Sequence, residues 1–191
     1  YSGGPLGGED WMIRPRLEAA YFKPISLGSL RTVAAVHIEV GIAKPFGSNP
    51  DGTDREILFL NKYFLGGESS VRGFEFRTIW VRDPVTGESI LQNGYYQGGE
   101  KSFVLNLEYH FLLGGPVRLV PFLDAGNVYS TEQNLDFSHM RYSAGIELRI
   151  NVPMFGAPLR FIYAINLDPL NLTGFHAERF KSFDFSIGTA F

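Results

Sequence analysis

The 191-residue sequence contains no cysteine, which excludes a disulfide framework and any thiolate metal site. It also lacks an apolar run near the roughly 20 residues that a transmembrane helix requires. The longest candidate, residues 32–42, is interrupted by His37 and Glu39. A strong charge of either sign is missing too: the net charge of −3 gives no basic footprint, so no nucleic-acid partner is expected. The chain is therefore either a soluble globular protein or a membrane protein built from strands.

Sequence signals for chemistry are absent as well. The chain has no nucleophile elbow, phosphate loop or carboxylate dyad, so we expect neither an enzyme nor a cofactor. The first residues have neither the basic nor the apolar region of a signal peptide, so the sequence is expected to begin after processing or inside a larger protein. The histidines show no metal-ligand spacing, and no metal site is expected at His37, His110, His139 or His176.

Aromatic residues and glycine are abundant, and many segments alternate between apolar and polar residues with a period of two. Aromatics make up 15% of the chain and there are 22 glycines, a composition typical of all-β proteins with many turns. Residues 141–153 alternate most cleanly, because apolar side chains from Tyr142 to Val152 share one face while Arg141, Glu147 and Arg149 share the other. Seven such segments are predicted to be strands, most of them long enough to cross a bilayer when tilted: 11–23, 31–44, 101–113, 117–129, 141–153, 159–167 and 182–191.

The connections between these strands alternate in length. Short ones (24–30, 114–116 and 154–158) alternate with longer ones (45–100, 130–140 and 168–181). Outer-membrane barrels have this pattern, with tight periplasmic turns and longer extracellular loops. A soluble sandwich or lipocalin-like barrel is the alternative, but it would turn its apolar face inward and would have no reason to keep its long loops at one end. The pattern favours an antiparallel transmembrane β-barrel, with Phe191 at the periplasmic edge.

The longest connection contains the segment FLGGESSVRGF at residues 64–74. Its Val71-Arg72-Gly73-Phe74 core resembles the loop-six signature of the BamA-type superfamily of outer-membrane assembly and secretion proteins. Four further segments resemble the family in order: residues 107–109, 122–129, 141–146 and the aromatic-terminated end at 183–191. A lone four-residue match would be weak, but five ordered matches span essentially the whole chain.

The resemblance implies a fold and a place within a larger protein. The family's barrels have sixteen strands, so the seven strands here are expected to form the C-terminal portion of the barrel, residues 1–191, with the long inserted loop 45–100. A complete eight-stranded barrel, or pairing with a second copy, is the alternative, because an open half-sheet would leave unpaired edges in lipid. Expected partners are outer-membrane lipid, client β-barrel proteins, periplasmic POTRA repeats and accessory lipoproteins.

The residues themselves suggest a role for Arg72. Glycines 66, 67 and 73 permit a sharp bend, and the planar arginine fork can reach carboxylates. The candidates are Glu108 and Asp124, which lie on consecutive strands. If the connection 114–116 places residue 108 opposite residue 122, both carboxylates point into the lumen at a diagonal spacing that one guanidinium can bridge. The resemblance implies the same contact, with loop six folded into the lumen. Solvated, unpaired lumen charges are the alternative.

By resemblance, the function is the insertion and folding of client barrels at a weak seam between the first and last strands. The last strand would carry that role by β-augmentation, through Phe183, Phe185, Ile187, Gly188 and Phe191, with Gly188 lowering strand stability. A two-partner secretion transporter or a plain small structural or porin-like barrel is the alternative.

Overall fold

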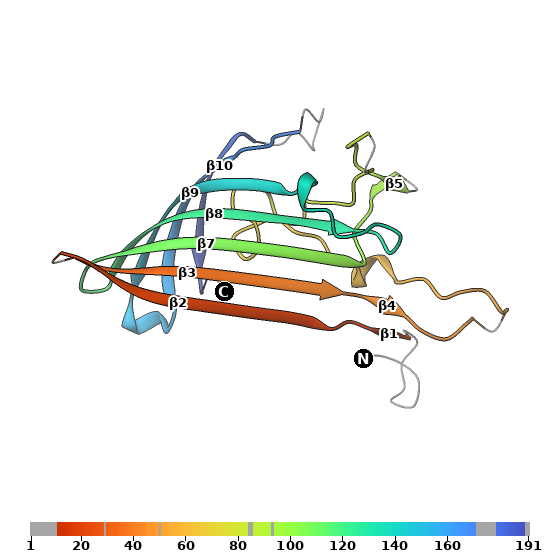
Figure 1. Ribbon diagram of the computed structural model, residues 1–191, viewed down its shortest axis with the longest axis horizontal. Helices are drawn as coiled ribbons and strands as arrows, with labels where there is room; N and C mark the ends of the chain where they lie inside the picture. Colours follow the sequence, from red (N-terminus) through yellow and green to blue (C-terminus); the bar gives the residue numbers. More distant parts are fainter. Residues whose placement is uncertain are drawn as a thin grey trace.

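The computed structural model describes residues 11–189 except residues 29, 50, 84, 85, 93 and 171–178. Seven long strands form one antiparallel sheet in the order β11-β10-β9-β8-β7-β3-β2, which confirms the predicted strands (Figure 1). Their bounds are β2 (Arg16–Leu27), β3 (Leu30–Ile42), β7 (Lys101–Gly114), β8 (Val117–Tyr129), β9 (Arg141–Asn151), β10 (Pro158–Asn166) and β11 (Lys181–Ile187). Among the described residues no pairing joins β11 to β2, so the sheet is open with these two strands at its edges.

Several small elements lie outside the seven long strands. Strand β1 (Met12–Ile13) pairs with β4 (Lys44–Pro45), and β5 (Leu91–Gln92) pairs with β6 (Tyr95–Tyr96). Three short 3-10 helices are η2 (Phe59–Asn61), η3 (Phe137–His139) and η4 (Pro153–Phe155). No helix in the described part of the chain is long and apolar enough to cross a membrane.

The pairing places the short connections at one end of the sheet and the long ones at the other (Figure 1). One predicted turn is wrong in extent: β2 continues through Pro24 to Leu27, which pairs with Leu30, so the connection is shorter than the predicted 24–30. Pro24 fits because β2 is an edge strand in this structure, where a missing N–H costs no ladder bond on the open side. The last strand is also shorter than predicted: β11 ends at Ile187, and Gly188, with a φ of 147°, donates a final backbone hydrogen bond to Pro158 at 3.0 Å.

The two faces of the sheet differ as the alternation predicted. On β7, Ser102, Asn106, Glu108 and His110 are buried on the face covered by the long connection. The side chains between them, such as Phe103 and Leu105, are only half-buried on the other face. The long connection packs on the polar face through an apolar cluster with β7 and β8 that comprises Ala43, Ile57, Tyr63, Leu65, Val71, Phe74, Ile79, Val81, Val104 and Val128. The sheet therefore has an apolar outer face and a polar inner face plugged by its own loop.

A β-bulge sets the register between β7 and β8. Leu112 pairs with Arg118 and Gly114 pairs with Val117, so Leu113 is the extra residue. The bulge moves Glu108 opposite Phe122 and Asn106 opposite Asp124. Because neighbouring residues on a strand face opposite ways, a one-residue slip would turn Asp124 to the outer face. The bulge is therefore what keeps Glu108 and Asp124 on the same inner face.

Candidate functional site: a buried clasp around Arg72

The tip of the long connection bends sharply before it reaches the sheet. Gly66, Gly67 and Gly73 all have positive φ, of 108°, 100° and 86°. The backbone N–H of Gly67 donates to the carbonyl of Phe74 at 3.0 Å, which closes the bend. The Asn106 side-chain amide on β7 donates to the carbonyl of Ser70 at 2.8 Å and ties the bend to the sheet. Arg72 is thereby presented to the inner face, where it is 2% exposed.

Asp124 is the principal partner of Arg72. The arginine Nε and Nη2 donate to the two carboxylate oxygens at 2.8 and 2.7 Å, and the backbone N–H of Arg72 adds a third bond at 3.0 Å. A bidentate pair of this kind fixes orientation as well as charge. The Asp124 side chain is 0% exposed, so the pair is fully withdrawn from water.

Glu108 completes the predicted contact. The Nη1 of Arg72 donates to Glu108 Oε1 at 2.7 Å, and His110 Nε2 lies 2.8 Å from Glu108 Oε2. The Arg72 guanidinium also stacks on the Phe122 ring, 3.7 Å from its centroid. The structure therefore places Arg72 between Glu108 and Asp124, and the alternative of solvated, unpaired charges does not describe it.

A third carboxylate, Glu147 on β9, belongs to the same site. Arg72 Nη1 donates to its Oε2 at 2.7 Å. Arg149 donates to Oε1 from Nε at 2.5 Å, and Arg160 donates to Oε1 and Oε2 at 2.6 and 3.0 Å. Arg149 also reaches Glu108 at 2.6 Å. We refer to these six residues, Arg72, Arg149, Arg160, Glu108, Asp124 and Glu147, as the clasp.

The charges of the clasp cancel, with three arginines against three carboxylates. This balance matters because an unpaired buried charge is far more costly than a buried pair. The alternation had already placed Glu147 and Arg149 on the polar face of β9, but nothing in the sequence assigned them to Arg72. The missing information was the register between strands, which decides which polar residues meet.

Arg160 also connects the clasp to two other segments. Its guanidinium lies 3.3 Å from the carbonyl of Glu68 in the long connection and 3.3 Å from the carbonyl of Thr189 beyond β11. The loop, the clasp and the end of the last strand therefore share one side chain.

The other residues of the signature pack around the clasp. Val71 is 0% exposed in the apolar cluster, and Phe74 lies under the Arg141 guanidinium, whose central carbon is 4.8 Å from the centroid of the Phe74 ring.

The last-strand residues Phe183, Phe185 and Ile187 are more than half exposed on the outer face, and the expected Phe191 lies outside the described residues. His37 and His110 are buried on the inner face, His139 is in η3, and His176 is outside the described part.

Gly73 is expected to be intolerant of substitution. Its φ is positive, and an added Cβ would lie 3.0 Å from Ala164 Cβ and 3.3 Å from Ser143 Cβ. We expect Gly73→Ala to destabilise the docked loop by about 1–3 kcal/mol. Gly115→Ala is the matched control, because Gly115 also has a positive φ but faces open space. Denaturant unfolding of the two variants in vesicles measures the difference, and equal losses would show that crowding at Gly73 has no effect.

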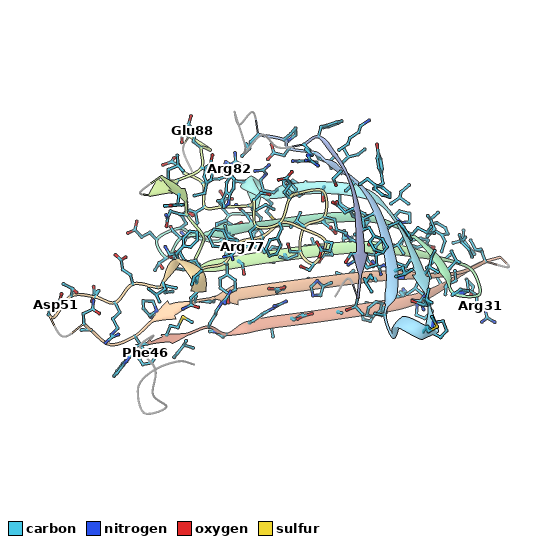
Figure 2. All side chains as sticks on the ribbon, turned by 180° about the vertical axis from the view of Figure 1, so that it is seen from behind. Arg31, Phe46, Asp51, Arg77, Arg82 and Glu88 are labelled. Carbon is cyan, nitrogen blue, oxygen red and sulfur yellow. The ribbon has the colours of Figure 1, made fainter. Side chains whose placement is uncertain are left out.

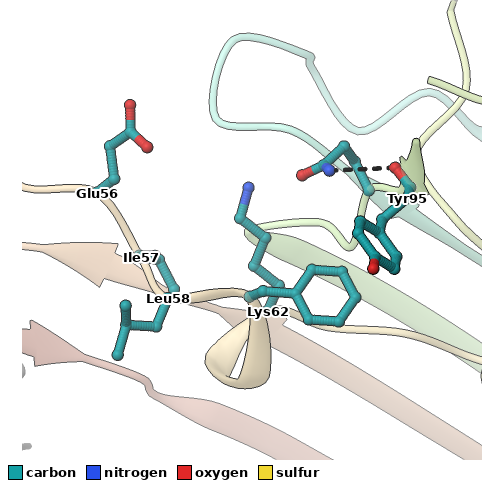
Figure 3. A pocket seen from close by; sticks show the side chains of 7 residues that line it. Glu56, Ile57, Leu58, Lys62 and Tyr95 are labelled. Atoms are coloured by element: carbon teal, nitrogen blue, oxygen red, sulfur yellow. Dashed lines mark hydrogen bonds between the residues drawn. The ribbon is translucent and has the colours of Figure 1, made fainter. Parts of the chain in front are cut away.

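A pocket of about 530 Å³ lies in the long connection, near Glu56, Leu58, Lys62 and Tyr95 (Figure 3). Its one cation, Lys62, is already paired with Glu100 at 2.8 Å. No group of three or more His, Cys, Asp or Glu in the described ranges could hold a metal ion. We therefore take the clasp as the candidate functional site.

Comparisons with known proteins agree with this architecture. The Omp85 superfamily domain matches residues 1–191. An outer membrane protein assembly factor BamA of Nitratidesulfovibrio vulgaris (strain Hildenborough) is 31% identical over 195 residues, covering 100% of this chain and 22% of that protein. BamA of Neisseria meningitidis serogroup B is 29% identical over 184 residues, covering 80% of this chain and 21% of that protein. This chain thus spans about a fifth of the length of these relatives.

A solved structure is similar in fold. The crystal structure of BamA from Haemophilus ducreyi lacking POTRA domains 1–3 superposes with a TM-score of 0.66 at 21% identity. The match covers 95% of this chain and 36% of that one. At this identity the likeness supports the arrangement of strands alone.

Proposed function

Because this chain belongs to the Omp85 superfamily of outer-membrane β-barrel proteins, we propose that it is the C-terminal portion of a sixteen-stranded barrel that inserts and folds client barrels. The family's assembly factors are not enzymes, and the chain is an outer-membrane protein by this membership. Residues 1–191 would supply the last seven strands and the loop that folds into the lumen. The open edges at β2 and β11 support this proposal, because an open sheet in lipid requires further strands.

The observation that carries the proposal is the clasp. It holds the long connection against the inner face of the sheet by buried ion pairs on β7, β8 and β9. A plain porin needs an open lumen for its solutes, whereas this half of the lumen is filled by an apolar cluster and a locked loop. The geometry therefore favours an assembly or secretion role over simple permeation.

The last strand would provide the site of client insertion. β11 pairs only with β10 in the described sheet, so one row of its backbone N–H and C=O groups is free for another strand. Phe183, Phe185 and Ile187 would face lipid on the outer surface, and Gly188, directly after β11, makes the last backbone hydrogen bond to β10 in the described part of the chain. The missing first strand of the barrel would form the other side of this seam. The short-hairpin end would face the periplasm, where POTRA repeats and accessory lipoproteins would deliver the client.

Reconstitution tests the assignment. Full-length protein in liposomes is expected to accelerate the folding of an unfolded client barrel at least several-fold over protein-free liposomes, measured by the heat-modifiable gel shift of the client. A secretion transporter would instead move a polypeptide into the liposome without speeding barrel folding, and a porin would give conductance alone. Either of those results, with no acceleration, rejects the assembly role.

A further inference from the structure

A row of three arginines crosses the neighbouring strands β8, β9 and β10, and two of the three belong to the clasp. Arg118 on β8 lies opposite Arg149 on β9, and Arg149 lies opposite Arg160 on β10. Like charges that face one another across a sheet are destabilising unless each is neutralised. Arg149 and Arg160 are neutralised by Glu108 and Glu147. The side chain of Arg118, by contrast, has no hydrogen bond or ion pair with any residue that the structure describes.

Arg118 is also a surplus charge. The six charges of the clasp already cancel, so no carboxylate of the clasp remains to balance a fourth arginine. Arg149 leaves part of its own fork unused: its Nε and Nη2 donate to Glu147 and Glu108, while its Nη1 has no partner within the described ranges. Arg149 is only 9% exposed, so these free donors are held in place by the protein.

These donors line a cavity of about 250 Å³ on the inner face, formed by Phe22, His110, Arg118, Arg149, Asn151, Pro158 and Thr189. The cavity lies toward the short-hairpin end, because Arg118 is one residue from the start of β8 and Asn151 is the last residue of β9. Arg31 marks this end in Figure 2, opposite the end that carries Asp51 and Glu88. Phe22 and Pro158 give the cavity an apolar wall beside its cations.

We propose that this cavity binds a carboxylate side chain of a polypeptide that enters the barrel from the short-hairpin end. Arg118 and the free Nη1 of Arg149 would take the carboxylate oxygens, because guanidinium groups bind carboxylates through paired N–H donors. The apolar wall would pack against the methylene stem of a glutamate. A bound carboxylate would also neutralise Arg118, the one arginine of the row that no described carboxylate pairs with. The site is separate from the client seam, and its occupancy can be read without any folding assay.

The test uses full-length protein in detergent and a fluorescein-labelled tetraglutamate peptide, with tetraglutamine as the neutral probe. Fluorescence anisotropy is expected to show tetraglutamate binding more tightly than tetraglutamine, with affinity falling as salt is raised. Arg118→Gln is expected to weaken tetraglutamate binding about tenfold, as the loss of one charge-assisted contact. Arg31→Gln is the matched control: it removes the same charge at the same end, from an exposed position outside the cavity. It should leave the affinity within about twofold.

Several results would overturn the proposal. Equal binding of the two peptides, or no binding of either, would show that the cavity does not take an added carboxylate. An equal loss in the Arg31 and Arg118 variants would mean that general electrostatic attraction replaces a defined site. Inorganic phosphate that displaces the peptide at a matching concentration would assign the cavity to small anions. Because none of these readouts involves client folding, they are distinct from failure of the assembly role.

Discussion

Arg72→Ala is expected to release the long connection from the sheet and to abolish most of the proposed assembly activity. Removing the guanidinium leaves Asp124, Glu108 and Glu147 buried beside one another with only Arg149 and Arg160 to balance them. Breaking a buried ion pair by removing one partner costs about 3–5 kcal/mol. The backbone N–H of Arg72 would still reach Asp124, but the bidentate contact and the stacking on Phe122 would be lost.

Two substitutions show what the loss depends on. Arg72→Lys keeps the charge but cannot bridge three carboxylates with a planar fork, so we expect an intermediate loss of stability and activity. Arg55→Ala removes another arginine of the same connection, one that makes no contact with the clasp in the described structure. It is expected to change the free energy of unfolding by less than about 1 kcal/mol. Denaturant unfolding in vesicles and the client-folding rate measure both effects. An Arg72→Ala protein with wild-type stability and wild-type client folding would show that the clasp has no function.

The inner and outer faces of the sheet were predictable because side chains along a strand alternate between the two faces with a period of two residues. Alternation alone places Glu108, Asp124 and Glu147 on polar faces of their strands, and loop lengths alone place the long connections at one end. The turn predicted at residues 24–30 is too long, because β2 continues through Pro24 to Leu27. Pro24 instead lies on an edge strand, and the position of an edge depends on the order of strands rather than on local sequence.

The full clasp was not predictable, because it depends on register between distant strands. The Arg72 contact with Glu108 and Asp124 required residue 108 to face residue 122, and a bulge at Leu113 is what establishes that pairing. Membership of Glu147 required a second register, between β8 and β9, where Asp124 lies opposite Ser143. Arg149 lies two residues after Glu147 on β9, and Arg160 lies opposite Arg149 on β10. Both arginines can therefore reach Glu147. At each of these strand pairs, composition and periodicity do not fix the register to within one or two residues.

The pairing of Glu147 with Arg160 provides a second prediction with a large effect. Glu147 accepts hydrogen bonds from three arginines and its side chain is 0% exposed. Glu147→Leu would leave these arginines facing only Glu108 and Asp124, so we expect a loss of about 3–5 kcal/mol. Arg160→Met would leave one excess negative charge and would also remove the contacts to Glu68 and Thr189. Each single variant therefore buries a charge without its counterpart.

The double variant Glu147→Leu with Arg160→Met should recover part of that loss. It returns the clasp to two arginines against two carboxylates and replaces one buried ion pair by apolar side chains of similar size, an exchange that is often neutral for stability. We expect the double variant to be more stable than the sum of the single losses by about 1–3 kcal/mol, the coupling that a double-mutant cycle measures for contacting charges. Unfolding of all four proteins in vesicles gives this value. Strict additivity would mean that Arg160 acts through Glu68 and Thr189 alone, and that charge balance does not hold the clasp together.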